Sequence, residues 1–401
     1  MPHKLQLAVG LDAGSSRTRC VIGTVEDECL RLLGFGETKS EGWTKSRIAD
    51  QTAVANSMRR ALEEAERMSG VSAESCVLGV GGATVRGSNA RSEIEIGRPR
   101  EIDHRDVSRA VDRVSRVQLQ DDRMFLQVLL QDFVVDDHPG HRDPRRMVAA
   151  RIEANAHLIT VSEREHNHLV AAANQAHVAV EETVFEAFAA GHSVVLPEER
   201  KEGVAVVDIG AHSTDLVVYH GDAVQLAASL PICGDHLTRD VARGLCLSFD
   251  DAACLKEEYG CATVGRTPDN SFIEVPALAS EGREPRQVQR KMLNQIIEAR
   301  ADELFRHILR ELERVGMERA LLGGIVLTGG TARLHEVCDA AERVLRCEAR
   351  KGLTAGIEDW PEELSEPAWS TAAGLAMYSG RLKMREEIEN RASGLLGWIF
   401  G

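Results

Sequence analysis

Hydrophobic positions along the chain change their period several times, and these changes mark out strands and helices. An apolar run at residues 5–11 predicts a buried strand, and residues 20–25 predict its hairpin partner. Apolar residues recur every three to four positions over residues 51–68, which predicts an amphipathic helix. A short apolar run at residues 76–80, followed by two glycines, predicts another strand. Strands and helices that alternate in this way indicate an α/β fold.

The composition changes between residues 83 and 162, where Arg and Asp become frequent. A helical run at residues 106–117 and β-like stretches at residues 125–135 and 157–161 predict a small α+β unit there. Residues 163–191 then show the patterns of a helix, a strand and an Ala-rich helix. We therefore expect residues 83–162 to be inserted into the first unit, which resumes after them.

A second passage, residues 203–224, repeats the order found near the N-terminus: strand, Asp-Gly turn, strand, turn, strand. Asp12 and Asp208 occupy the same place in the two repeats, so we expect two lobes of similar design. Residues 236–300 are expected to be largely helical. The remaining elements predicted for this lobe are a β-like piece at residues 271–275, a helix at 301–315 and a strand at 324–328.

Length and charge limit the classes of function. A chain of 401 residues exceeds a single core, so two to four packed units are expected. The formal net charge of −15 opposes binding to nucleic acid, which needs a basic face, and we expect no such partner. Nine cysteines without CxxC pairs fit reduced thiols in a cytosol. We expect neither a secretory signal nor a run of about 18 apolar residues that could span a bilayer.

Two turns have the composition of phosphate-binding loops. In the first, a strand delivers Asp12 to a turn in which Gly14 lets the backbone approach a ligand and two serines add hydroxyls. Successive backbone N–H groups in such a turn bind anions, and a carboxylate beside them can hold Mg²⁺ through water. The second loop repeats this design around Asp208 and Gly210. One such hairpin alone could be an ordinary turn, whereas two on opposite lobes can clamp a polyphosphate.

A third segment, residues 324–334, consists of an apolar strand that ends at Gly329-Gly330 and enters a helix. Two adjacent glycines allow the backbone to lie flat against a base or a sugar. After two Asp-containing loops, this segment predicts that the bound polyphosphate belongs to ATP, with Mg²⁺ as the accompanying ion.

These three motifs, in this order, resemble the superfamily of actin, heat-shock chaperones and sugar kinases. The closer resemblance is to the FtsA family of bacterial cell-division proteins, and it covers essentially the whole chain. Matching stretches include VLLQDFVVDDHPG at residues 128–140, ICGDHLTRDVA at residues 232–242 and IEVPALASEGREPRQVQRKMLNQIIEAR at residues 273–300. The resemblance implies an actin-like two-lobed fold, with a ribonuclease H-like duplicated core and an inserted SHS2-like α+β subdomain, 1C.

The resemblance also implies boundaries for the subdomains. They are 1–82 and 163–200 for lobe 1A, 83–162 for the inserted 1C, 201–235 and 301–380 for lobe 2A, 236–300 for 2B, and 381–401 for a linker and a C-terminal amphipathic membrane-targeting segment.

In the FtsA family, the proteins form actin-like filaments, 2B binds the C-terminal peptide of FtsZ, and the C-terminal helix attaches to the membrane. The resemblance therefore implies an ATP-binding protein that tethers FtsZ filaments to the cytoplasmic membrane, promotes Z-ring assembly and recruits later division proteins. Its expected location is the cytoplasmic face of the bacterial inner membrane, at the division site.

The matching motifs imply a set of nucleotide-binding residues. They are Gly14, Ser15, Ser16, Arg17, Asp208, Gly210, Ala211, His212, Ser213, Thr214, Gly234, Asp235, Lys256, Gly329, Gly330, Thr331 and Arg333. Asp12 is expected to hold Mg²⁺ through water, and Asp12 and Asp208 are the catalytic candidates. The sequence departs from the family pattern at Ala211-His212, where glycines are usual, at Ala253, where a Glu is expected, and at Arg17, where a Lys is usual. These departures predict a protein that binds ATP and is at most a weak ATPase.

Two segments are candidates for contact with partners. A basic cluster stands out in the acidic chain and is implied to receive the FtsZ peptide, although its charge alone also fits a solvated helix face: Arg286, Arg290, Lys291 and Arg300. A charged helix is expected from about residue 380, followed by apolar residues that can enter the headgroup region of a membrane: Leu395, Leu396, Trp398, Ile399 and Phe400. The alternative for this tail is a terminal helix docked on the protein's own core.

Two other functions fit parts of the pattern. A small-molecule kinase of the same superfamily would need a carboxylate base facing a substrate pocket. A pilus-assembly cytoplasmic platform protein shares the 1C insertion. The stretch at residues 273–300 and the apolar tail favour the FtsZ tether over both.

Overall fold

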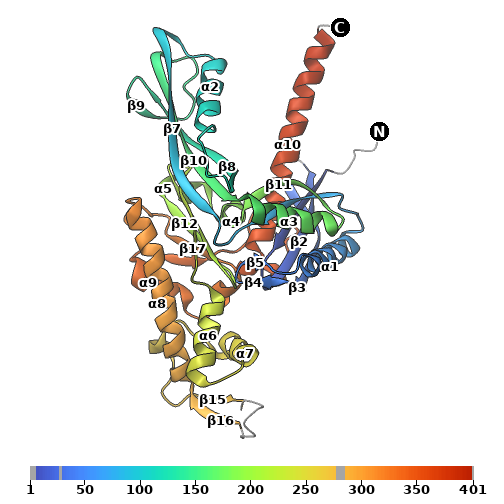
Figure 1. Cartoon of the computed structure of the whole chain (residues 1–401), viewed down its shortest axis with the longest axis vertical. Helices are drawn as coiled ribbons and strands as arrows, with labels where there is room; N and C mark the ends of the chain where they lie inside the picture. Colours follow the sequence, from blue (N-terminus) through green and yellow to red (C-terminus); the bar gives the residue numbers. More distant parts are fainter. Residues whose placement is uncertain (1–5, 27–28, 277–284, 400–401) are drawn as a thin grey trace.

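The computed structural model describes residues 6–26, 29–276 and 285–399, of which residues 387–399 are described by their backbone alone. Two lobes face each other, and a third unit projects from them (Figure 1). Lobe 1 is built on a sheet of six strands in the order β11-β6-β1-β2-β3-β19. Their bounds are β1 Leu7–Ala13, β2 Arg17–Glu26, β3 Cys29–Lys39, β6 Ser75–Val80, β11 Ala179–Phe185 and β19 Ile357–Glu358.

Lobe 2 repeats this topology strand by strand. Its part of the second sheet runs β18-β17-β12-β13-β14, which corresponds in order to β11-β6-β1-β2-β3. In both lobes the first two strands are antiparallel and the first strand also pairs in parallel with the fourth. The bounds are β12 Val204–Ile209, β13 Thr214–His220, β14 Ala223–Leu230, β17 Ile325–Thr328 and β18 Ala349–Lys351. The predicted internal repeat is thus a duplicated fold.

Each face of the lobe 1 sheet is covered by a helix. Val9 and Leu11 of β1 pack with residues of helix α1 (Gln51–Ser69), while Ala8 lies on the other face against α10 (Ser370–Ile399). Helix α1 begins where the Asp50 side chain accepts the backbone N–H groups of Thr52 and Ala53. Alternation along a strand produces this two-sided burial.

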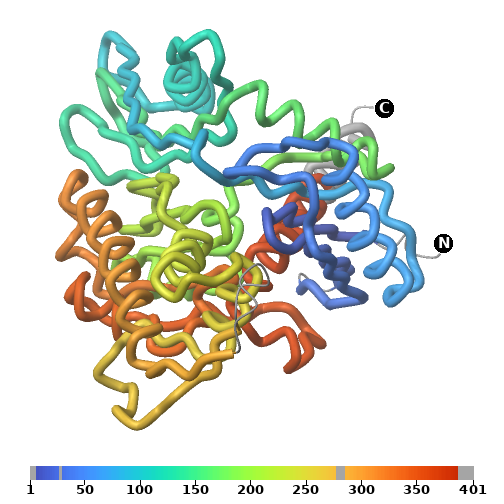
Figure 2. Tube along the Cα trace, turned by 60° about the horizontal axis from the view of Figure 1, so that its bottom comes forward, coloured from blue at the N-terminus to red at the C-terminus, as the bar shows by residue number. Residues whose placement is uncertain are grey.

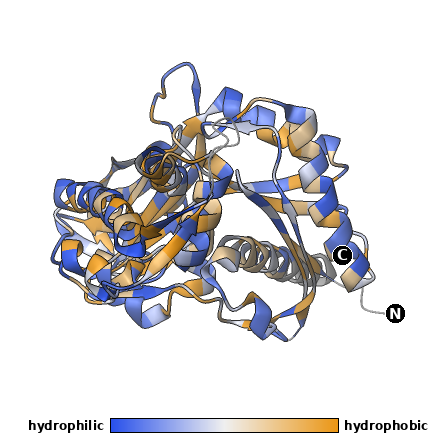
Figure 3. Cartoon of the chain, turned by 90° about the horizontal axis from the view of Figure 1, so that it is seen from below, coloured by the Kyte–Doolittle hydropathy of each residue, from blue (hydrophilic) through white to orange (hydrophobic). Residues whose placement is uncertain are grey.

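Helices α4 (Glu186–Val194) and α10 lie between the two sheets and join the lobes. One core cluster contains residues of both lobes, such as Val9 and Val206, together with α4 residues such as Ala189. The hydropathy colours of Figure 3 show the apolar residues concentrated on the strands and on the inward faces of the helices. The lobes therefore share a hydrophobic interior at the base of the space between them.

The inserted unit consists of long antiparallel strands and one helix. The strands are β7 Arg86–Glu101, β8 Arg123–Val135, β9 His138–His141 and β10 Val148–Ser162, and the helix is α2 His104–Val114. One pair, Ala228 with Arg86, connects β14 to β7 and makes one nine-stranded sheet of lobe 2 and the insert. Figure 2 shows the insert, cyan to green, beside both lobes. Strand β7 has few apolar residues, which is why its pattern did not predict it.

The other helices are α3 Glu163–Gln175, α5 Pro197–Glu202, α6 Gly234–Leu245, α7 Phe249–Tyr259, α8 Arg290–Arg314 and α9 Val337–Leu345. The short hairpins are β4 Trp43–Thr44 with β5 Arg47–Ile48 and β15 Phe272–Val275 with β16 Arg286–Gln289.

Two predicted helix boundaries were wrong. The helix expected at residues 301–315 begins at Arg290, and the helix expected from about residue 380 begins at Ser370. Both helices run through the expected limits at residues 300/301 and 380/381. In α8 the buried apolar face continues across the limit, with Ile297 before it and Ala301 after it.

Candidate functional site

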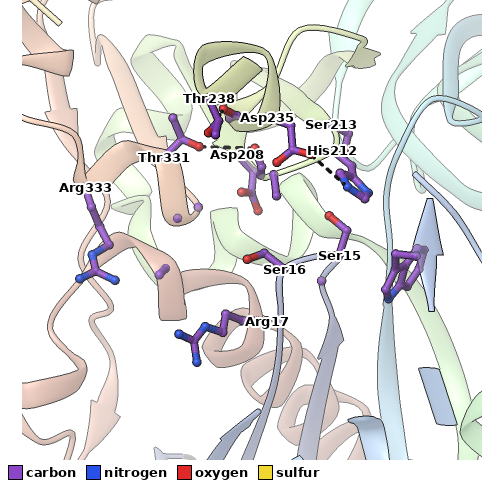
Figure 4. Close-up of a pocket in the computed structure, with 18 of the residues that line it drawn as sticks. Ser15, Ser16, Arg17, Asp208, His212, Ser213, Asp235, Thr238, Thr331 and Arg333 are labelled. Atoms are coloured by element: carbon purple, nitrogen blue, oxygen red, sulfur yellow. Dashed lines mark hydrogen bonds and ion pairs between the residues drawn. The ribbon is translucent and has the colours of Figure 1, made fainter. Parts of the chain in front are cut away.

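A cleft with a cavity volume of about 760 Å³ lies between the lobes and is lined by both predicted phosphate loops. This volume lies within the range of small-molecule sites. Asp12 is near the end of β1 and Asp208 near the end of β12, so the duplicated fold brings the two loops face to face. Figure 4 shows Ser15 and Ser16 from one loop opposite Asp208 and Ser213 from the other.

The structure brings almost all of the predicted nucleotide residues to this cleft. Those that line it are Asp12, Gly14, Ser15, Ser16, Arg17, Asp208, Gly210, Ala211, His212, Ser213, Gly234, Asp235, Lys256, Gly329, Gly330, Thr331 and Arg333. Thr214 is the exception: it is fully buried and its hydroxyl donates to the Ile232 carbonyl at 2.7 Å. Alternation along β13 turns Thr214 away from the cleft, so its assignment to the site was wrong.

Four carboxylates lie at or just beneath the floor of the cleft, two of them buried and two partly exposed, and the sequence analysis identified Asp12 and Asp208 among them. The other two are Asp215, which pairs with Asp208 across β12 and β13, and Glu186, the first residue of α4. Burial, together with the neighbouring acids, raises the pKa of Asp12 and of Asp215 to about 7 and that of Glu186 well above its ordinary value. An acidic residue inside the apolar run VFEAFAA was the available signal for Glu186.

Such a floor favours cations and proton transfer. Asp208 accepts a 2.6 Å hydrogen bond from the Thr371 hydroxyl in the first turn of α10, where the helix dipole also favours negative charge. The backbone N–H of Gly82, in lobe 1, is 3.3 Å from both carboxylate oxygens of Asp215, in lobe 2. Among the described residues no group of three His, Cys, Asp or Glu side chains is placed to hold a metal ion directly. The carboxylates present fit a magnesium ion only as partial ligands, with water and phosphate oxygens supplying the rest.

A buried arginine that the sequence analysis missed lies beside these acids. Arg19 pairs with Asp12 across β1 and β2, and its side chain is 10% exposed. Its guanidinium contacts Glu37 at 2.6 Å and lies over the Trp369 ring, while its Nε atom has no partner among the described residues. Burial raises the pKa of Asp12 and of Asp208, and the positive charge of Arg19 partly offsets this rise.

His212, at a position where the family usually has glycine, is among the residues that line the cleft. Neither Ala211 nor His212 has a positive φ, so the backbone of the loop does not require glycine there. The His212 Nε2 atom is 3.3 Å from Asp235, as the dashed line in Figure 4 shows, and its Nδ1 atom accepts the Ser46 backbone N–H at 3.2 Å. The imidazole is therefore held at the side of the cleft.

The opposite end of the cleft suits a base and a sugar. Phe249 and Ala253 of α7 line it, and the Lys256 ammonium donates to the Thr238 hydroxyl at 2.9 Å. Burial lowers the pKa of Lys256. A Cβ atom at Gly330 would meet no atom within 4 Å, so the backbone there is open to the cavity.

The buried acids predict a pH-dependent stability of the nucleotide-free protein. In the folded state Asp12 and Asp215 keep their protons to about pH 7, whereas in the unfolded chain they lose them near pH 4. The unfolded state thus binds fewer protons over this interval, and stability falls as the pH rises from about 4 to 7. Glu186→Gln should raise the melting temperature at pH 8 by about 3 °C or more and flatten this dependence. Thermal unfolding of both proteins at pH 5.5 and pH 8 tests this; parallel curves would refute it.

The predicted peptide-binding cluster lies on two elements rather than on one helix. Arg286 is on β16, where it donates to the Leu245 carbonyl, and Lys291, near the start of α8, forms an ion pair with Asp269 at 2.7 Å. Arg300 is turned inward, toward Asp240 and Glu303, at 2.6 Å from each. The cluster does not form a single helix face, because residues 286–289 form a strand.

The predicted membrane residues fall outside the described side chains. Leu395, Leu396, Trp398 and Ile399 are described by backbone only, as part of α10, and Phe400 lies outside the described residues. Among the described helices, none is long and apolar enough to cross a bilayer. Figure 1 shows that α10 leaves the body of the protein as it approaches its C-terminal end.

Comparisons with known proteins agree with this arrangement. The family model of cell division protein FtsA matches residues 205–374, and that of the SHS2 domain inserted in FtsA matches residues 82–160. The chain resembles the PilM–PilN type IV pilus biogenesis complex (TM-score 0.64, 18% identity, 93% of this chain and 98% of that one). It also resembles MreB5 of Spiroplasma citri bound to ADP (TM-score 0.59, 12% identity, 95% of this chain and 98% of that one). At these identities the structures show a shared actin-like fold.

Relatives that match over nearly their full length narrow the assignment. Cell division protein FtsA of Pseudomonas aeruginosa is 31% identical over 390 residues, which cover 97% of this chain and 93% of that protein. Cell division protein FtsA of Escherichia coli is 30% identical, over 98% of this chain and 96% of that protein. With an actin-like fold, an SHS2 insertion and relatives of this extent, the chain belongs to the FtsA family of cell division proteins.

Proposed function

We propose that this protein binds ATP with Mg²⁺ in the interlobe cleft and tethers FtsZ filaments to the cytoplasmic face of the bacterial inner membrane. The observation that carries the nucleotide assignment is the meeting of two duplicated hairpin loops over one acidic floor. Solved actin-like structures of MreB5 from Spiroplasma citri contain ADP and AMPPNP, which supports the same use of the cleft here.

The residues divide by the part of the nucleotide that they would hold. The loop amides and hydroxyls at Ser15, Ser16 and Ser213 suit the phosphates, because they present several donors to one space. Asp12 and Asp208 suit the magnesium ion, which would neutralise phosphate charge. Lys256 and the open backbone at Gly330 suit the sugar and the base.

The tether needs two further contacts on opposite ends of the molecule. One is the surface around β15, β16 and the start of α8, where Arg286, Arg290 and Lys291 would meet the acidic C-terminal peptide of FtsZ. The other is the C-terminal end of α10. In Figure 1 these elements lie at the bottom and the top of the view, so a bound peptide would not obstruct a membrane. Self-association into actin-like filaments would strengthen a weak single anchor through avidity, and the insert is the surface that we assign to later division proteins.

A flotation experiment tests the tether. Liposomes of bacterial lipid composition, mixed with FtsZ polymers and this protein with ATP, should carry FtsZ to the top of a density gradient. Deleting residues 387–401 should lower the liposome-bound protein about tenfold or more, since the apolar residues of the tail are the main source of membrane affinity. The described core of lobe 1 ends before this cut, so folding should be retained.

A second arm separates the two contacts. FtsZ lacking its C-terminal peptide should stay at the bottom of the gradient while the full-length protein still floats. If the truncated protein floats like the full chain, the tail is not the anchor. If peptide-less FtsZ floats with it, the peptide is not the ligand.

A further inference from the structure

The hairpin β4–β5, in lobe 1, contacts the second phosphate loop, in lobe 2, through His212. The Ser46 backbone N–H donates to His212 Nδ1 at 3.2 Å, and the Ser46 hydroxyl donates to the His212 carbonyl at 2.7 Å. Lys45 and Ser46 both have positive φ, as in the tight two-residue turns of β-hairpins. The hairpin tip therefore presents the Ser46 amide in one fixed direction.

These contacts define which ring nitrogen carries the proton. Because Nδ1 accepts the Ser46 N–H, the neutral imidazole has its proton on Nε2. That nitrogen is 3.3 Å from an Asp235 carboxylate oxygen. One side chain thus accepts a hydrogen bond from lobe 1 and contacts a carboxylate of lobe 2.

The loop that carries His212 is itself fixed to lobe 2. The Asp235 backbone N–H donates to the Ala211 carbonyl, and the Gly234 backbone N–H donates to the Gly210 carbonyl, both at 2.9 Å. Arg239 also contacts the Asp235 carboxylate, at 3.5 Å. His212 is consequently attached to the rigid first turn of α6, and a glycine at this position would offer the hairpin no side chain.

Ser46, His212 and Asp235 all line the cavity, next to the loops that face each other across it. We propose that His212 is a positioning residue that fastens the β4–β5 hairpin across the phosphate end of the cleft and thereby slows the release of bound nucleotide. This rests on nucleotide binding in the cleft, but the fastening itself can be measured without any ligand.

The first measurement is hydrogen–deuterium exchange of the nucleotide-free protein. In His212→Asn the amide oxygen occupies the place of Nδ1 and can still accept the Ser46 N–H. In His212→Gln the amide reaches only the place of Nε2, so the Ser46 N–H loses its acceptor, while the Ser46 hydroxyl keeps its bond to the backbone carbonyl of residue 212. The Trp43–Ile48 segment should exchange about three- to tenfold faster in His212→Gln than in His212→Asn, as expected for the loss of one such hydrogen bond.

The second measurement is the rate at which a fluorescent ADP leaves the same proteins. Release should be about three- to tenfold faster from His212→Gln and His212→Ala, and near the parent rate from His212→Asn. Arg47→Ala, which changes an exposed residue of the same hairpin, should leave both measurements unchanged.

The outcomes separate the two proposals. Equal hairpin exchange in His212→Gln and His212→Asn would overturn the bridge. A difference in exchange with equal release rates would overturn its effect on the nucleotide. If no variant, nor the parent protein, binds ADP, the proposed function fails while the exchange result still decides whether the bridge exists.

Discussion

Gly374→Ala is expected to destabilise the protein by about 3 kcal/mol or more, because it separates two helices that touch through their backbones. A Cβ atom at Gly374, in α10, would overlap the Ala189 carbonyl oxygen of α4. Neither backbone can rotate away as a side chain would, so α10 would have to move off α4 and off β1. A Cβ atom at Gly10 of β1 would likewise overlap the Ala372 carbonyl oxygen, so the helix has no space on that side either.

A second glycine of the same helix provides the control. A Cβ atom at Gly380 would meet its nearest neighbour, Val25 Cγ2, at an ordinary 3.4 Å. Gly380→Ala should therefore stabilise the helix by about 0.5–1 kcal/mol, the usual gain of Ala over Gly. Denaturant unfolding of both variants measures the difference, and equal midpoints would contradict the close contact of α4 with α10.

Gly329→Ala is expected to lower ATP affinity about 100-fold, equivalent to about 2.7 kcal/mol. Gly329 has φ 83° and ψ 170°, a region that is essentially restricted to glycine, so any side chain strains the turn. Its Cβ would also overlap Asp208 Oδ1 and lie 2.6 Å from the Ile209 carbonyl. The substitution therefore displaces both the turn and an acid of the cleft floor.

The neighbouring residue separates distortion from direct contact. A Cβ at Gly330 meets nothing within 4 Å, so Gly330→Ala should keep the parent melting temperature. Any loss of affinity in Gly330→Ala would then come from contact with the ligand. Equilibrium titration with a fluorescent ATP, alongside thermal unfolding, tests both variants. Parent-like affinity in Gly329→Ala would show that this turn does not shape the site.

The pattern of the sequence predicted the duplicated fold and the phosphate loops because both have local signals. An apolar strand that ends in an Asp-Gly turn can be recognised from its own segment of sequence. The order of these segments then predicted the duplication. Strand β7 was missed because most of it is exposed and its apolar alternation is limited to Ile94 and Ile96. The first part of α10, residues 370–380, was missed because it carries no charged residue and many small ones, so it shows little contrast between an apolar and a polar face. The part of α8 before residue 301 was assigned to the preceding region, 236–300, which was expected to be largely helical.

The acidic floor of the cleft was only half predictable. Asp12 and Asp208 stand in recognisable turns, but Glu186 begins a helix far away in the sequence, and Arg19 lies on an ordinary strand. Only the folded chain brings these four charges together, through strand pairing and the packing of α4. The contacts of His212 could not be predicted from the sequence either, because its partners, Ser46 and Asp235, lie on two other elements.

Helix α10 covers β1 and β2, yet the ribosome makes it after every strand of the lobe that it completes. One face of the lobe 1 sheet therefore stays uncovered during synthesis until residues such as Ala372 and Ala376 have emerged. Lobe 2 and the insert contain nearly all of their own core residues by that time and can become compact earlier. We therefore expect the usual order of folding, N-terminal part first, to be reversed for this chain, and we expect its unfinished first lobe to be the part most exposed to aggregation before release.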